Sequence, residues 1–77
     1  MIDKEAAISI ATKRLQIIYP EPKLLNASHQ ESLEEFDVGV SGWRIWFQVK
    51  DPDFGDYDRP VEVSDSTEEA RLVKILL

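Results

Sequence analysis

The segment from Trp43 to Lys50 constrains the fold of this chain more than any other. Apolar side chains recur there at every second position: Trp43, Ile45, Phe47 and Val49 alternate with Arg44, Trp46, Gln48 and Lys50. Because successive side chains of a strand point to opposite faces, this period of two predicts a strand with one apolar face. A second layer of structure must cover that face. Trp46 is the exception, an aromatic residue on the polar face.

A helix predicted from Asp3 to Tyr19 can supply the second layer. Asp3 suits the N-cap position, and Pro20 disfavours helical geometry at the residue before it. The helix has a wide apolar arc made by Ala7, Ala11, Leu15 and Ile18, flanked by Ile8 and Tyr19 on one side and Ile10 and Ile17 on the other. Either a curved sheet surrounds the helix, or the Ile10/Ile17 edge meets a second surface.

Further short strands are predicted on both sides of Trp43–Lys50. Residues 24–28 form one, and residues 60–65 form another with Val61 and Val63 on the same face. Residues 33–40 are either a strand or an ordered loop. Residues 51–60 form a long acidic turn. Residues 70–77 are interpreted as a final strand, with a helix over residues 67–77 as the alternative.

This order of elements predicts an α+β fold: one N-terminal helix packed on a three- to four-stranded antiparallel meander sheet, as a single domain over residues 1–77. A chain of 77 residues has one small core and little volume for a substrate cavity. It has no cysteine, which excludes disulfides, thiolate metal sites and a cysteine nucleophile. It also has no apolar run of about 20 residues, so we expect a cytoplasmic protein with no membrane association.

The net charge of −6 is concentrated in the middle of the chain. Residues 31–62 carry nine acids and three bases, which accounts for a net −6, whereas residues 1–30 carry a net +1. Such a field repels phosphate backbones, so no nucleic-acid partner is expected. It attracts a basic protein surface instead. The alternative interpretation is a solvated acidic face that keeps a small protein soluble.

The sequence gives little support for catalysis or for a cofactor. The single histidine, His29, is interpreted as an exposed loop residue, and its neighbour Ser28 would point to the opposite face of a strand. Residues 51–62 have acids at some positions of a calcium loop, but Asp56 stands where that loop requires glycine. We therefore predict no catalytic residue, no cofactor and no metal ligand.

A protein-binding surface is the more direct interpretation of the acidic turn. Two aromatic residues lie there among four aspartates, and aromatic anchors within a charged rim are typical of interaction hot spots. In the alternative, one of the aromatic residues folds back to cap the sheet. Trp46 is added because it either lies on the open sheet face or is covered by a second subunit. Two acids of the preceding segment are added because they extend the acidic patch. The predicted site comprises Glu34, Glu35, Trp46, Asp51, Asp53, Phe54, Asp56, Tyr57 and Asp58.

Two motifs in the carboxy-terminal half point to a family. The run G-W-R-I-W-F from Gly42 to Phe47 and the run R-P-V-E-V-S-D-S-T from Arg59 to Thr67 resemble the immunity protein 35 family. A helix followed by a Trp-bearing hairpin is also similar to PepSY-like domains. Glu68 departs from both patterns, since glycine is usual at that position of the turn. The matching positions are Gly42, Trp43, Phe47, Pro60, Val63, Asp65 and Thr67.

The first resemblance implies a cytosolic immunity protein that blocks a bacterial toxin by binding, without turnover. The basic active-site cleft of the toxin would bind the acidic patch of residues 31–37 and 51–58. Two alternatives remain open. One is a PepSY-like modulator that binds a protease or peptide at a sheet edge. The other is a self-associating structural domain, a homodimer formed through Trp46 or through the Ile10/Ile17 edge.

Overall fold

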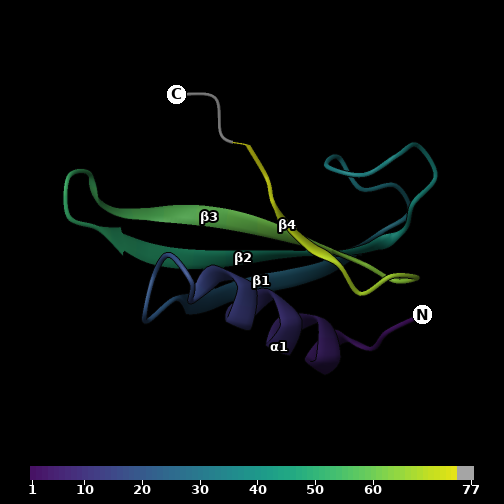
Figure 1. The fold of residues 1–77 in the computed structure, drawn as a ribbon, viewed down its shortest axis with the longest axis horizontal. Coiled ribbons are helices and arrows are strands. Elements are labelled where there is room, and N and C mark those ends of the chain that lie inside the picture. Colours follow the sequence, from purple (N-terminus) through teal and green to yellow (C-terminus); the bar gives the residue numbers. More distant parts are fainter. Residues whose placement is uncertain (75–77) are drawn as a thin grey trace.

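The computed structural model describes residues 1–74 and has one helix followed by four strands (Figure 1). The strands pair in sequence order in one antiparallel sheet, β1-β2-β3-β4, and the helix covers one face of it. The predicted α+β meander is therefore confirmed, with four strands. The elements are α1 (Lys4–Leu15), β1 (Lys23–Gln30), β2 (Gly42–Asp51), β3 (Gly55–Ser64) and β4 (Ala70–Leu72).

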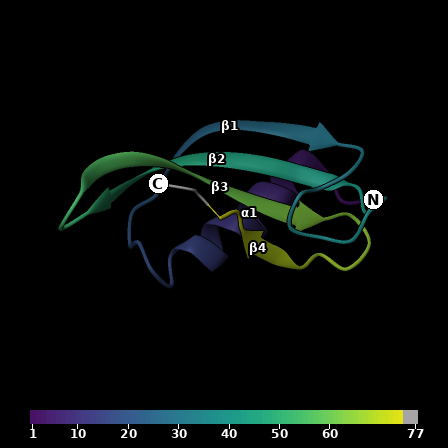
Figure 2. The ribbon, with the colours of Figure 1, turned by 90° about the horizontal axis from the view of Figure 1, so that it is seen from above.

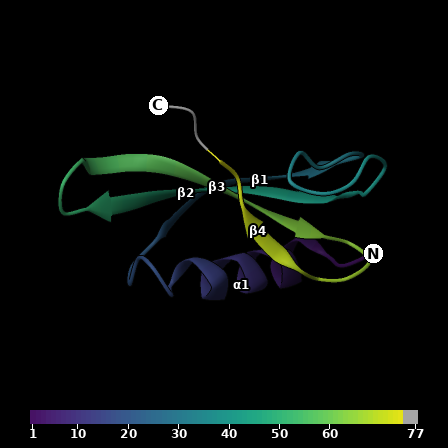
Figure 3. The same ribbon diagram turned by 45° about the horizontal axis from the view of Figure 1, so that its top comes forward.

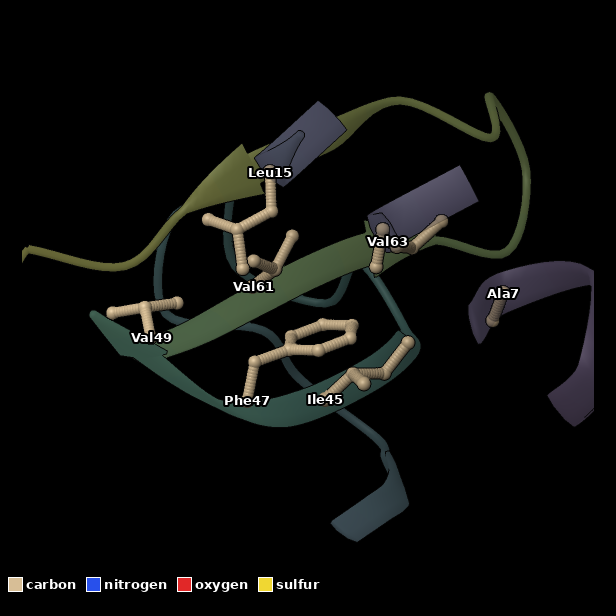
Figure 4. Close-up of a cluster of buried hydrophobic side chains, with 8 residues drawn as sticks. Ala7, Leu15, Ile45, Phe47, Val49, Val61 and Val63 are labelled. Carbon is tan, nitrogen blue, oxygen red and sulfur yellow. The ribbon is translucent and has the colours of Figure 1, made fainter. Parts of the chain in front are cut away.

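The core forms between α1 and the apolar face of β2 and β3, as the alternation predicts (Figure 4). Ile45, Phe47 and Val49 of β2 are buried, whereas Trp43 is half-buried. The small residues of α1 let the helix approach the sheet closely. Burial of each larger side chain contributes about 1.5–3 kcal/mol. The buried cluster comprises Ala7, Ala11, Leu15, Ile45, Phe47, Val49, Val61 and Val63.

The helix begins where the sequence predicts and ends earlier. The side chain of Asp3 accepts a hydrogen bond from the Ala6 N–H at 2.7 Å, which makes Asp3 the N-cap. At the other end, the N–H groups of Ile18 and Tyr19 both donate to the Leu15 carbonyl, so the chain turns away there. Ile17 and Ile18 are 77% and 52% exposed, and the prediction that Ile18 belongs to the buried stripe was wrong. The proposed Ile10/Ile17 edge does not form, because Ile10 lies in α1 and Ile17 lies after its end.

The β2–β3 hairpin is longer and tighter than the predicted acidic turn. β3 begins at Gly55, and only residues 52–54 form the turn, so Asp56, Tyr57 and Asp58 are strand residues. Cross-strand pairing with β2 overrides the low strand propensity of aspartate. Gly55 has a φ of 76°, a left-handed conformation that glycine adopts without strain and that closes the turn.

The remaining segments settle the open alternatives where they are described. β1 is longer than the predicted strand and has a bulge between Leu24 and Asn26. Residues 33–40 form an irregular loop, and its Leu33 is buried. Residues 70–72 form a strand and not a helix. Residues 73 and 74 of the predicted final strand are not part of it, and residues 75–77 lie outside the described residues. In the turn before β4, Glu68 has a φ of 58° at the position where the resembling families carry glycine.

Two ends of the sheet can now be distinguished. Residues 31–41 lie at one end, on the face opposite α1, and we call this the loop end; residues 51–58 form the hairpin end (Figures 1 and 3). The face opposite α1 is the open face. The ten residues of β2 separate the two ends by about 30 Å, at a rise of ~3.3 Å per residue.

Gly42 fixes the loop end to the sheet. A Cβ atom at this position would lie 2.0 Å from the Val63 carbonyl oxygen and 2.8 Å from the Leu33 side chain. Only glycine allows so close an approach, and Leu33 packs into the space that the missing side chain leaves.

Candidate functional site

The hairpin turn is held by one of its own aspartates. The Asp51 carboxylate accepts hydrogen bonds from the backbone N–H groups of Asp53 and Phe54, at 2.8 and 3.1 Å. An aspartate that bonds to the backbone two residues ahead stabilises a tight turn. Asp51 is one of the predicted site residues, and its carboxylate is therefore already hydrogen-bonded within the chain.

Four of the predicted site residues at the hairpin end are exposed. Phe54 is 76% exposed at the tip of the turn, next to Asp53. Asp56 and Asp58 are exposed on the open face of β3, opposite Lys50 and Gln48 of β2. Among the described residues, none of these three carboxylates forms an ion pair within the chain. The hairpin end, which projects beyond the rest of the sheet (Figure 3), thus carries an exposed aromatic side chain and three carboxylates without an ion pair in the described chain.

Tyr57 belongs to the core side of the hairpin. It pairs with Val49 and faces α1, where its ring meets the ring of Tyr19 edge-on at 6.2 Å between centroids. The two hydroxyls are hydrogen-bonded to each other. This hydrogen bond is the largest cause of the raised pKa of Tyr19, and burial is the second. The alternative that an aromatic residue folds back is therefore correct for Tyr57, and the prediction of Tyr57 as a free anchor was wrong.

Trp46 lies in the middle of the open face. Its neighbours across the sheet are Asn26 on β1 and Pro60 on β3, and it is half-buried. It shares this face with Asp56 and Asp58, because residues of β2 and β3 that oppose one another point the same way. Trp46, Asp56 and Asp58 therefore lie on the same face of the sheet, the open face.

Glu34 and Glu35 do not join the acids of the hairpin end. Both are bonded to Glu62, which is opposed to Arg44, about 23 Å along β2 from Asp51 at ~3.3 Å per residue, so the predicted single acidic patch was wrong. The Glu34 carboxylate lies 3.2 Å from the Arg44 guanidinium. The Glu35 carbonyl accepts a 2.6 Å hydrogen bond from Arg71, whose guanidinium lies over the Phe36 ring at 4.3 Å.

The residue that organises the loop end, Glu62, is not among the predicted site residues. Glu62 is fully buried on the open face, beneath the loop. Its carboxylate accepts the backbone N–H groups of Glu34 and Glu35, at 3.2 and 2.8 Å, and two bonds from Arg44, at 3.1 and 2.8 Å. The bond to Glu62 is the main cause of the raised pKa of Arg44. The sequence feature that could have indicated this ion pair is the hairpin register, which places Arg44 directly opposite Glu62.

A second buried carboxylate lies at the same end. Asp65 accepts hydrogen bonds from His29 at 2.7 Å and from the Ser41 hydroxyl at 2.9 Å. Burial acts to raise its pKa, but the bonds from His29 and Ser41 outweigh burial, and the pKa lies below its usual value. His29 is exposed, as predicted, but it lies in β1 and not in a loop, bonded to Asp65 and edge-on to Trp43.

This second cluster has the residue types of a hydrolytic site in a different arrangement. The Asp65 carboxylate stands between the Ser41 hydroxyl and the His29 ring, and both bond to the same oxygen. A nucleophile needs the base itself as its neighbour. The cluster therefore joins β1, the loop and the turn that follows β3.

The described residues offer little for other chemistry. No group of three or more His, Cys, Asp or Glu side chains among residues 1–74 is placed to hold a metal ion. A shallow pocket of about 230 Å³ lies at the hairpin end, lined by Tyr19, Pro20, Glu21 and Lys50. No helix in the described part of the chain has the length and apolar character needed to cross a bilayer.

Comparison with known proteins adds no assignment: no family model, no curated protein and no solved structure matches this chain.

Proposed function

We propose that this chain is a protein-binding module that uses the hairpin end and the adjoining open face to bind a basic protein. The observation that carries the proposal is the exposed Phe54 ring, held at the tip of a projecting turn among carboxylates that pair with no cation in the described chain. The binding surface comprises Trp46, Asp53, Phe54, Asp56 and Asp58.

Two different roles follow for the residues of this surface. Phe54 and Trp46 supply apolar area that is removed from water on binding, and such aromatic residues account for much of the affinity in protein interfaces. Asp53, Asp56 and Asp58 attract a cationic partner and accelerate the encounter, an effect that weakens as salt is added. The same charges oppose binding to nucleic acid.

The class of partner is proposed from the resemblance to immunity proteins. A bacterial toxin with a basic active-site cleft presents the charge that this surface complements. The module would act by occupying the cleft, with no turnover, in the cytoplasm where such a toxin would otherwise act.

The proposal is tested with the candidate toxin encoded beside this gene. Isothermal titration calorimetry should detect a complex at micromolar concentration or below. Truncation of Phe54 to alanine should weaken it by about 30-fold, the equivalent of ~2 kcal/mol for an interface hot spot. Reversal of charge in the triple variant D53K/D56K/D58K should reduce the association rate by about 10-fold or more at low salt.

A matched triple variant at the other end separates local from global charge. The substitutions E31K/D37K/E68K change the net charge by the same amount, and all three side chains are exposed near the loop end. This variant should change the association rate much less than the hairpin variant. If no complex forms at micromolar concentration, or if both variants behave alike, the proposed surface is wrong.

A further inference from the structure

Strand β1 has one edge without a partner in the chain. It lies at the border of the sheet and pairs with β2 on one side only. With eight residues it is much longer than β4, the three-residue strand at the opposite border. An edge of this length presents a row of backbone N–H and C=O groups that can pair with another strand.

The helix leaves much of β1 uncovered. α1 runs diagonally beneath the sheet, and its main contacts are with β2, β3 and β4 (Figure 2). Leu24, which pairs with Phe47 on the helix side, and the bulge residue Leu25 are 45% and 46% exposed. Ile17 and Ile18, in the connection that leads to β1, are more exposed still. Apolar area therefore accompanies the open edge.

Charge also distinguishes this border of the molecule. The chain has a net charge of −6, yet residues 24–30 contain no Asp, Glu, Lys or Arg. Two β1 edges can approach each other without opposing like charges. Lys23 and Glu31 mark the two ends of this uncharged stretch and have opposite signs. An antiparallel pairing of two copies brings each Lys23 toward the Glu31 end of the other copy.

We propose that a second copy of this chain pairs with the first along β1, antiparallel and about a two-fold axis, to form one continuous eight-stranded sheet. Two residues that oppose each other in paired strands lie on the same face of the sheet. In a two-fold pairing, the axis must then pass beside one residue, which opposes the same residue of the other copy. An axis at Ser28 uses the whole regular part of the strand beyond the bulge and opposes Asn26 to Gln30 of the other copy. The two helices then lie on the same side of the sheet, and the two hairpin ends point in opposite directions.

The first test is the mass of the protein in solution. Sedimentation equilibrium of the purified chain across the micromolar to millimolar range should show a shift from 8.8 kDa toward twice that mass. The substitution S28E places two carboxylates face to face on the axis, while within one chain it places a carboxylate beside Arg44. It should weaken dimerisation at least 10-fold. A protein that remains monomeric throughout the range overturns the proposal.

The second test is a disulfide cross-link. The chain has no native cysteine, so an introduced cysteine can pair only with its copy in another chain. Directly opposed residues of antiparallel strands have Cα atoms about 4.5–5.5 Å apart, a distance that a disulfide spans. S28C should therefore form a disulfide dimer rapidly on mild oxidation. Q48C is the matched control, since Gln48 is also half-buried on the open face but lies on an inner strand. Equal rates of cross-linking for the two variants overturn the proposed register.

Discussion

Acidic residues lie at both ends of the sheet, but the two ends use them in different ways. At the loop end, Glu62 and Asp65 are buried, and each accepts hydrogen bonds from several groups of the same chain. At the hairpin end, Asp53, Asp56 and Asp58 are exposed, and none forms an ion pair within the described chain.

The difference shows that a count of charges does not identify a binding surface. A carboxylate that accepts backbone N–H groups and an arginine fork from its own chain has few lone pairs left for a partner. Glu62 and Asp65 therefore contribute to the stability of the fold, whereas the carboxylates of Asp53, Asp56 and Asp58 remain accessible to solvent. The comparison can be tested by removing carboxylates from each end and measuring the free energy of unfolding.

The largest effect is expected from Glu62→Ala. The substitution leaves two backbone N–H groups and Arg44 without their main acceptor beneath the loop. Removal of one partner from a buried ion pair costs about 3 kcal/mol or more. Urea denaturation followed by circular dichroism measures it. Glu34→Ala is the control, because Glu34 is 65% exposed and its pair with Arg44 should contribute less than about 1 kcal/mol.

A smaller effect that depends on pH is expected from Asp65→Asn. The pKa of Asp65 is lowered in the folded chain, so its ionised form stabilises the fold above the usual pKa of aspartate, about 3.9. This contribution is lost as the pH falls through the lowered value. The substitution should cost about 1–2 kcal/mol at pH 6, and the two proteins should converge in stability at strongly acidic pH. A constant difference from pH 6 to pH 2 would contradict the assignment.

The smallest effect is expected at the hairpin end. Asp53→Ala and Asp58→Ala remove exposed carboxylates that have no ion-pair partner in the described residues, so each should change the free energy of unfolding by no more than about 0.5 kcal/mol. Thermal unfolding at neutral pH is sufficient for this measurement. A loss above about 1 kcal/mol would mean that these acids are structural, and the contrast between the two ends would disappear.

The parts of the fold that follow a local pattern could be predicted from the sequence. The strict alternation of β2 gave the correct faces, and Asp3 gave the correct start of α1. The end of α1 could not be predicted from periodicity, because Ile17 and Ile18 continue the apolar pattern after the chain has turned at Leu15. The hairpin was underestimated because Asp56 and Asp58 disfavour strands locally, and only their pairing with β2 stabilises them there.

The candidate site was predicted in part, for a similar reason. Phe54 and its neighbouring aspartates are exposed, as a polar turn suggests. The positions of Tyr57, Glu34 and Glu35 depend on residues far away in the sequence. Tyr57 is bonded to Tyr19, and the backbone of Glu34 and Glu35 is bonded to Glu62 and Arg71. Burial of Glu62 depends on a loop with no regular pattern, which no local rule places over the sheet.

Gly42 also bears on how more distant relatives could be recognised. Any other amino acid at this position would have to displace the Val63 carbonyl, which β2 holds in place through the paired strand. Saturation mutagenesis of this codon should therefore return a single viable amino acid, whereas the exposed tip should accept many. A sequence that aligns another amino acid with Gly42 would therefore be expected to have a different connection between Leu33 and β2.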